Sequence, residues 1–279
     1  MARDRSPAAP GTGATVPFAP GELLTIANGP LVVTVAPQAG GRVAQIIYRG
    51  VPLLIDYAPE TSAMIAWGSY PMVPWAGRVR DGGFDFQGNR YELPLNLGEH
   101  AIHGVGFGLP WRVDSLEKNF IELSLVLPKD ERWPFGGAAA QRIEAGNGWL
   151  KMKLSVRAME RAMPATIGWH PWFRKPERLD FTPSKIYPRD ARGIAIKPCI
   201  DPTSGPWDDC FINDDPVVLH YAGQSARLLS DCDHWVVYDE TTYATCVEPQ
   251  SGPADSFNIE QTVLQPGETL ERSFLIEWD

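Results

Sequence analysis

The chain has 279 residues, of which 44% are hydrophobic and 21% charged, and these ordinary globular values exclude wholesale disorder. Its formal net charge of -9 disfavours polyanions and anionic membranes, so we expect no nucleic acid partner and no membrane partner. The sequence contains no apolar run of about 20 residues, no signal-peptide core and no C-x-x-C pair, so we expect a cytoplasmic protein with free thiols.

The opening segment is rich in Ala, Pro, Gly and Thr and has no apolar periodicity. This composition is typical of a mobile tail. We therefore predict a disordered tail over residues 1–20 and a single folded domain over residues 21–279.

Short runs of alternating apolar and polar residues then recur between turn residues. Residues 31–35 and 151–156 alternate with a period of two, which is typical of strands. Residues 84–91, with Gln-Gly at their centre, predict a hairpin, and the Gly-Asn-Gly sequence at 146–148 predicts a second turn.

The final run, residues 266–278, predicts a Pro-Gly turn followed by an alternating strand. No segment of about 12 residues carries an apolar stripe with a period of 3.6, so we expect little helix. No repeat with a period of roughly 20 to 50 residues is present, which argues against a propeller or a solenoid. The pattern predicts an all-β fold, a large antiparallel β-sandwich.

Two histidine segments could form the walls of a pocket. His100 and His103 lie among glycines, which allow close backbone approach to a ligand. His170 is flanked by Trp169, Trp172 and Phe173, and these aromatic residues fit either a buried core or a sugar-binding pocket. Composition does not choose between the two interpretations.

A third candidate is Glu248, which follows an apolar strand and immediately precedes a loop rich in Pro and Gly. A partly buried carboxylate at a strand end can have a raised pKa and serve as a base. An exposed loop glutamate would fit the same pattern.

In this order, the segments resemble the aldose 1-epimerase (galactose mutarotase) family, and more closely its bacterial epimerase-like branch, from about Gly29 to Asp279. The matching segments are PMVPWAGRVR at 71–80, HAIHG at 100–104 with Trp111 after it, GWHPWF at 168–173, WDDCF at 207–211, TCVEPQ at 245–250 and LQPGE at 264–268. Each is short, and their order and spacing carry the resemblance.

This resemblance implies a galactose mutarotase-like supersandwich and an enzyme that interconverts the α and β anomers of a hexose. By position, Glu248 takes the role of the base and His170 that of the general acid. Arg78, His103 and Asp208 take the sugar-binding roles. Asp209 is a close alternative to Asp208. The sequence departs from the typical galactose enzymes directly after Arg78, so the resemblance assigns no residue to contacts near O6 of the sugar.

Three alternatives stay open. Arg78, Arg80 and Arg90 fall in one stretch and could bind a hexose phosphate. A non-catalytic carbohydrate-binding protein on the same fold would keep the aromatic residues. A metal site of His100, His103, His170 and Glu248 is disfavoured, because i, i+3 spacing places the first two on opposite faces of a strand.

We expect no cofactor and no metal, a small-molecule sugar as substrate, and a monomer or homodimer.

Overall fold

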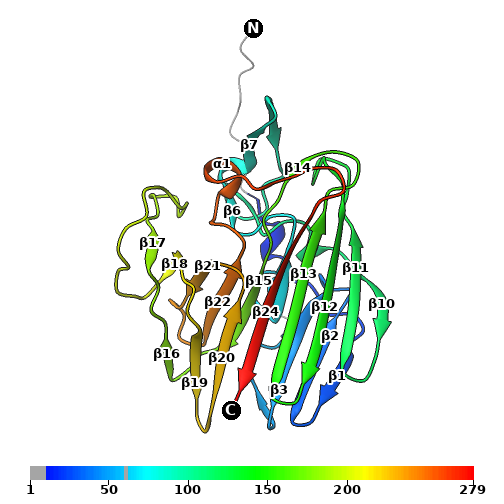
Figure 1. Cartoon of the computed structure of the whole chain (residues 1–279), viewed down its shortest axis with the longest axis vertical. Coiled ribbons are helices and arrows are strands. Elements are labelled where there is room, and N and C mark those ends of the chain that lie inside the picture. The colour runs from blue at the N-terminus through cyan, green and yellow to red at the C-terminus, as the bar shows by residue number, and fades with distance from the viewer. Residues whose placement is uncertain (1–10, 60–61) are drawn as a thin grey trace.

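The computed structural model describes residues 11–59 and 62–279, which form mainly antiparallel strands (Figure 1). The helical elements within these residues are short: η1 (Gly13–Thr15), η2 (Arg80–Gly82), η3 (Gly106–Gly108) and α1 (Ser256–Ile259). In these ranges, no helix has the length and apolar character needed to span a bilayer.

Two large sheets make up most of the described structure. The larger sheet has, in spatial order, β1 (Leu24–Asn28), β2 (Leu31–Ala36), β3 (Arg42–Tyr48), β5 (Ser69–Met72), β15 (Gly168–Arg174), β22 (Ala244–Gln250), β21 (His234–Tyr238), β18 (Asp208–Ile212) and β17 (Lys185–Tyr187), with β4 (Val51–Pro52) paired to β3. The smaller sheet has β10 (Arg112–Leu116), β11 (Phe120–Val126), β12 (Ala138–Gly146), β13 (Trp149–Arg157), β24 (Thr269–Trp278), β20 (Gln224–Ser230), β19 (Val217–Tyr221) and β16 (Arg178–Asp180).

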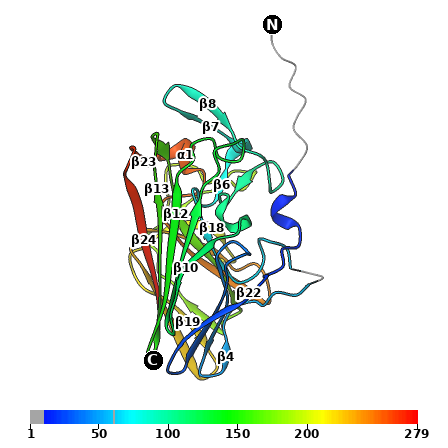
Figure 2. The same ribbon diagram turned by 90° about the vertical axis from the view of Figure 1, so that its right-hand side faces the viewer.

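Short strand pairs occur near one end of the molecule. They are β6 (Arg78–Val79) with β9 (Ala101–Ile102), β7 (Gly83–Phe86) with β8 (Asn89–Glu92), and β14 (Met163–Pro164) with β23 (Val263–Leu264). Figure 2 shows the β7–β8 hairpin projecting from this end.

The main hydrophobic core lies between the two large sheets. It combines Val33 and Ile46 from the larger sheet with Ile143 and Phe274 from the smaller one, all of them fully buried. The strands within each large sheet pair in antiparallel fashion, many of them through short hairpin connections. The predicted all-β antiparallel sandwich is confirmed.

The local strand predictions also agree with the structure. Residues 31–35 lie in β2, and residues 151–156 lie in β13. The Gln-Gly pair at 87–88 joins β7 to β8, and both of its residues take the positive φ angles that tight hairpins require. The Asn-Gly pair at 147–148 joins β12 to β13, and here Gly148 has the positive φ. The final strand, β24, pairs with β13 and β20 in the middle of the smaller sheet.

The predicted tail needs a correction. Residues 1–10 lie outside the described part of the chain, but residues 11–20 are built into the fold. Ala14 is fully buried, its N–H donates to the Asn96 carbonyl, and the Val16 carbonyl accepts from the Met64 N–H. Composition did not reveal this packing, because the partners of the segment lie far away in the sequence.

Candidate functional site

The site is built on two neighbouring strands in the middle of the larger sheet. The register of β15 and β22 pairs Gly168 with Gln250 and Trp172 with Cys246, and it therefore sets His170 directly opposite Glu248. The Nε2 atom of His170 lies 3.1 Å from the Oε1 atom of Glu248. Cross-strand neighbours on one face of an antiparallel pair are close enough for such contact.

Strand alternation places this pair on the face that points away from the main core. Trp169 and Phe173 on β15 pack into the core between the sheets, whereas His170 and Trp172 point to the other face. The buried-core and the pocket interpretation of this aromatic segment are therefore each correct for part of it. Part of it is core, and His170 and Trp172 form a pocket wall.

A cavity of about 340 Å³ lies over this face. All five residues predicted for the site line it, and so does the alternative aspartate: Arg78, His103, His170, Asp208, Asp209 and Glu248. Further lining comes from Trp172, Tyr238, Gln250 and a segment that follows β17. A concave site with apolar walls and a few convergent polar groups suits a small polar ligand such as a sugar.

Burial shifts the pKa values of the central pair in opposite directions. Glu248 is 2% exposed, and the loss of solvation, followed by the nearby charge of Asp208, raises the pKa of its carboxyl well above the ordinary range. A hydrogen bond from Gln250 to Oε2 of Glu248, 3.1 Å long, opposes this rise. Burial lowers the pKa of His170 to about 3, so the imidazole by itself is neutral at physiological pH.

Aromatic rings hold the imidazole of His170 in place. Tyr70 stacks on it at 4.8 Å between ring centroids, and Trp172 stacks on it at 5.5 Å. The hydroxyl of Tyr70 and the indole N–H of Trp172 both donate to the carbonyl of Ile65, which fixes the two rings. The orientation of His170 is therefore set before any ligand enters.

His103 meets His170 edge to face, with ring centroids 4.9 Å apart. Burial, reinforced by His170, lowers the pKa of His103 well below its usual range, so this ring is also neutral. Within the described residues, the buried Nδ1 of His103 has no hydrogen-bond partner. Since His103 lines the cavity, its neutral imidazole can hydrogen-bond a sugar hydroxyl.

Gly104, which follows His103, does not have the predicted role of letting a ligand approach the backbone. His103 itself has a φ of 61°, and Gly104 follows with a φ of 76°. A Cβ on Gly104 would lie 2.1 Å from the Val73 carbonyl oxygen, which accepts the N–H groups of Val105 and Gly106. Here the glycine allows two backbone segments to approach each other, rather than a ligand to approach the backbone.

Sequence reasoning missed Arg189. Its Nη1 lies 2.6 Å from Oδ2 of Asp208, and its Nε lies 3.0 Å from Oδ1 of Asp209. Arg78 approaches the same Asp208 oxygen at 3.8 Å. Arg189 follows β17 in an irregular segment without periodicity or a motif, so no pattern in the sequence could have pointed to it.

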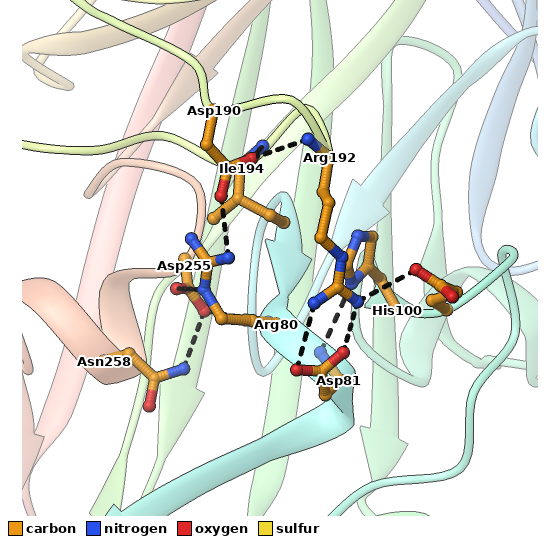
Figure 3. A network of polar contacts seen from close by, with 9 residues as sticks. Arg80, Asp81, His100, Asp190, Arg192, Ile194, Asp255 and Asn258 are labelled. Carbon is orange, nitrogen blue, oxygen red and sulfur yellow. Dashed lines mark hydrogen bonds and ion pairs between the residues drawn. The ribbon is translucent and has the colours of Figure 1, made fainter. Parts of the chain in front are cut away.

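The three arginines that suggested a phosphate site do not converge. Only Arg78 among them lines the cavity. Arg80 pairs with Asp190 at 2.7 Å and with Asp255 at 3.6 Å, as Figure 3 shows, and Arg90 lies on the β7–β8 hairpin near Asp85. The structure therefore removes the observation that favoured a phosphorylated sugar.

Of the four residues considered as metal ligands, His103, His170 and Glu248 line the cavity, and His100 does not join them. In the described part of the chain, the donor atoms that come within 4.8 Å of one another belong to His170, Cys246 and Glu248. Burial raises the pKa of the Cys246 thiol well above its usual range, so this thiol stays protonated and is a poor ligand. His100 does not line the cavity, and its Nδ1 accepts the N–H of Asp81.

Comparison with known proteins adds the family context. Residues 22–277 match the family model of aldose 1-epimerase. The uncharacterized protein YihR of Escherichia coli K12 is 27% identical over 159 residues, which cover 54% of this chain and 50% of that protein. The chain thus spans about half the length of the curated relatives it matches.

Two solved structures have a similar fold. A galactose mutarotase-like protein from Clostridium acetobutylicum superimposes with a TM-score of 0.83 at 17% identity, over 94% of this chain and 97% of that one. The galactose 1-epimerase from Lactobacillus acidophilus NCFM gives a TM-score of 0.78 at 18% identity, over 95% and 97% of the two chains. These likenesses confirm the predicted galactose mutarotase-like fold.

Proposed function

The chain belongs to the aldose 1-epimerase family, and from this premise we propose that it is a mutarotase that interconverts the α and β anomers of a hexose by acid/base ring opening. The observation that supports the proposal best is the contact between Nε2 of His170 and Oε1 of Glu248 in the wall of a sugar-sized cavity. In a cyclic hexose, O1 and O5 are both bonded to C1. The base for one oxygen and the acid for the other must therefore be neighbours.

The pKa directions support a pair that holds a single labile proton. A raised pKa at Glu248 and a lowered pKa at His170 both favour the neutral pair over a buried carboxylate anion or a buried imidazolium alone. Their separation of 3.1 Å lets this proton lie on either partner. The pair titrates as one unit with two macroscopic pKa values.

In the proposed reaction, the proton of the pair starts on His170. Glu248 accepts the proton from the O1 hydroxyl while His170 donates its proton to O5, the C1–O5 bond breaks and a C1=O1 double bond forms. The pair still holds one proton, now on Glu248. After rotation about C1–C2, His170 takes back the O5 proton, Glu248 returns a proton to O1, and the ring closes as the other anomer.

Four of the remaining lining residues would orient the sugar. The proposed ligands for ring and exocyclic hydroxyls are Arg78 and the neutral His103, and the carboxylate of Asp208 would accept hydrogen bonds from sugar hydroxyls. Trp172 presents an indole to the C–H surface of the ring.

The direct test is anomer exchange measured by NMR with the purified full chain and galactose, glucose and glucose 6-phosphate. We expect accelerated exchange of at least one free hexose. Saturable sugar binding without any acceleration would contradict the proposal and indicate a carbohydrate-binding protein. Acceleration of glucose 6-phosphate alone would contradict the proposed free hexose substrate.

A further inference from the structure

The segment after β17 forms a strap along one side of the cavity. We define the strap as residues 188–196; within it, Arg189, Gly193 and Ala195 line the cavity. In Figure 1 it belongs to the yellow-green chain between β17 and β18, at the left of the molecule. The strap therefore brings a charged side chain to a wall that is otherwise built largely by the larger sheet.

The strap is closed on itself by its own hydrogen bonds. Arg189 and Ala195 form an antiparallel bridge, and the Ile196 N–H donates to the Pro188 carbonyl at 2.8 Å. Inside this loop, Oδ1 of Asp190 accepts the N–H groups of Arg192 and Ile194, at 2.8 and 3.1 Å. The backbone at Arg189 is thus held at a defined position.

Ion pairs tie the strap to the segment around η2 (Figure 3). Oδ2 of Asp190 accepts from Nη1 of Arg80 at 2.7 Å, and Arg192 pairs with Asp81 and, at 3.0 Å, with Glu99. Arg80 in turn is held by Asp255, whose Oδ1 accepts the Arg80 N–H at 2.9 Å. The η2 segment lies just after Arg78 in the chain, so these contacts connect the strap to another wall of the cavity.

From this fixed backbone, the guanidinium of Arg189 contacts two carboxylates at once. Its Nη1 donates to Asp208 and its Nε faces Asp209, so one guanidinium bridges the two carboxylates. The three side chains are only partly exposed, at 30%, 23% and 16% for Arg189, Asp208 and Asp209. A planar guanidinium fork suits this bridging geometry, and a lysine ammonium does not.

We propose that Arg189 is a positioning residue, which the strap presents to the cavity and which holds the carboxylate of Asp208 where it binds a sugar hydroxyl. Without Arg189, two neighbouring carboxylates would repel each other, and Asp208 would be free to rotate. The inference rests on the proposed mutarotase function, because it assigns Asp208 to the sugar. Arg189 acts through Asp208, because its Nη1 and Nε atoms already contact the carboxylates of Asp208 and Asp209.

The test combines variants with two readouts, hexose KM and kcat from NMR anomer exchange. In R189Q we expect KM to rise about 10-fold to 100-fold, the usual value of a hydrogen bond to a charged group, with kcat within about 3-fold of wild type. The KM of R189K should lie between the values of wild type and R189Q. The matched control is R112Q, which removes an exposed arginine paired with Asp114 at 2.6 Å on the other sheet and should leave both constants unchanged.

A double-mutant cycle tests whether Arg189 acts through Asp208. In a D208N background, adding R189Q should change KM by less than about 2-fold, because the carboxylate that Arg189 holds is already gone. If the two effects on KM multiply, Arg189 binds the sugar directly and the proposal is overturned. The proposal is also overturned if the KM of R189Q equals that of wild type.

Crystal structures of wild type and R189Q separate this inference from the proposed function. If the wild-type protein does not accelerate anomer exchange, the mutarotase proposal fails, and the position of Asp208 still decides the role of Arg189. A displaced Asp208 carboxylate with an unchanged strap supports the positioning role. An Asp208 carboxylate that stays in place overturns it.

Discussion

Glu248 lies directly across the strand pair from His170, and their side chains meet at 3.1 Å on the cavity face of the larger sheet. Both residues are buried and in contact, so we expect their protonation to be coupled. The most direct tests of the proposed chemistry therefore change one member of this pair and compare it with a similar residue elsewhere in the cavity.

Replacing Glu248 with glutamine should remove the base with little change in shape. We expect E248Q to lower kcat for anomer exchange by about 10²–10⁴-fold and to leave hexose affinity within a few-fold of wild type, because the hydrogen bond from Gln250 can still form. The measurements are NMR exchange and calorimetric sugar binding. E240Q is the matched control, an exposed glutamate at the same cavity, and should retain the wild-type rate. An E248Q rate equal to wild type would exclude Glu248 as the base.

The same substitution should stabilise the fold at neutral pH. Because the folded-state pKa of Glu248 is raised, the folded protein binds this proton more tightly than the unfolded chain does, so stability is lost as pH rises from about 4.5 through the folded pKa. A tenfold difference in proton affinity between the two states corresponds to about 1.4 kcal/mol. We expect E248Q to increase the free energy of unfolding at pH 7 by about 1–2 kcal/mol, measured by denaturant titration.

The stability gained in E248Q should disappear near pH 4, where the carboxyl of Glu248 is largely protonated in both the folded and the unfolded protein. E240Q should show no such pH-dependent gain, because Glu240 is exposed. A wild-type protein that is more stable than E248Q at pH 7 would show that the buried carboxylate is stabilised by its surroundings, which contradicts a raised pKa.

The pH dependence of activity should reflect a pair that works with one proton. The kcat/KM for anomer exchange should fall as pH rises through the upper pKa of the pair, where its last proton is lost, and as pH falls through the lower one, where both groups are protonated. In E248Q the carboxyl no longer titrates, so the alkaline limb should shift to lower pH, where His170 alone loses its proton. If wild-type activity keeps increasing above the raised pKa, the reactive form has no proton on the pair.

Gly104 should be less tolerant of a methyl group than Gly88, although both have a positive φ. A Cβ at Gly104 would lie 2.1 Å from the Val73 oxygen, whereas nothing lies within 4 Å of a Cβ at Gly88. We expect G88A to cost about 1 kcal/mol of stability and G104A at least about 2 kcal/mol more, with a raised hexose KM because His103 is displaced. Equal costs in thermal unfolding would contradict this account.

Activity should not depend on a metal ion at the His170, Cys246 and Glu248 cluster. The Cys246 thiol is buried and protonated, so C246S should keep the rate within about 3-fold, and dialysis against a chelator should leave it unchanged. Metal analysis of the purified protein provides the independent check. If the wild-type protein contains stoichiometric zinc and C246S loses both the zinc and the activity, the protein is a metal-dependent enzyme instead.

The sequence predicted the local elements of the fold well. Alternation with a period of two identified residues 151–156 as a strand, because the two faces of a strand meet different surroundings. Turn chemistry located the β7–β8 hairpin, because Gln87 and Gly88 take the positive φ angles of the turn. The packing of residues 11–20 was missed, since partners such as Asn96 and Met64 are remote in the sequence.

The sequence by itself determined the strands, the antiparallel sandwich class and, through motifs whose order resembles a known family, five residues that line the candidate site. Only the tertiary structure decided which strands are neighbours. Side-chain alternation says which face a residue occupies, but not which strand lies beside it, and pairing of β15 with β22 is what brings His170 to Glu248. The pKa shifts of the pair and the contact of Arg189 with Asp208 arise in the same way, because burial and proximity exist only after distant segments have packed together.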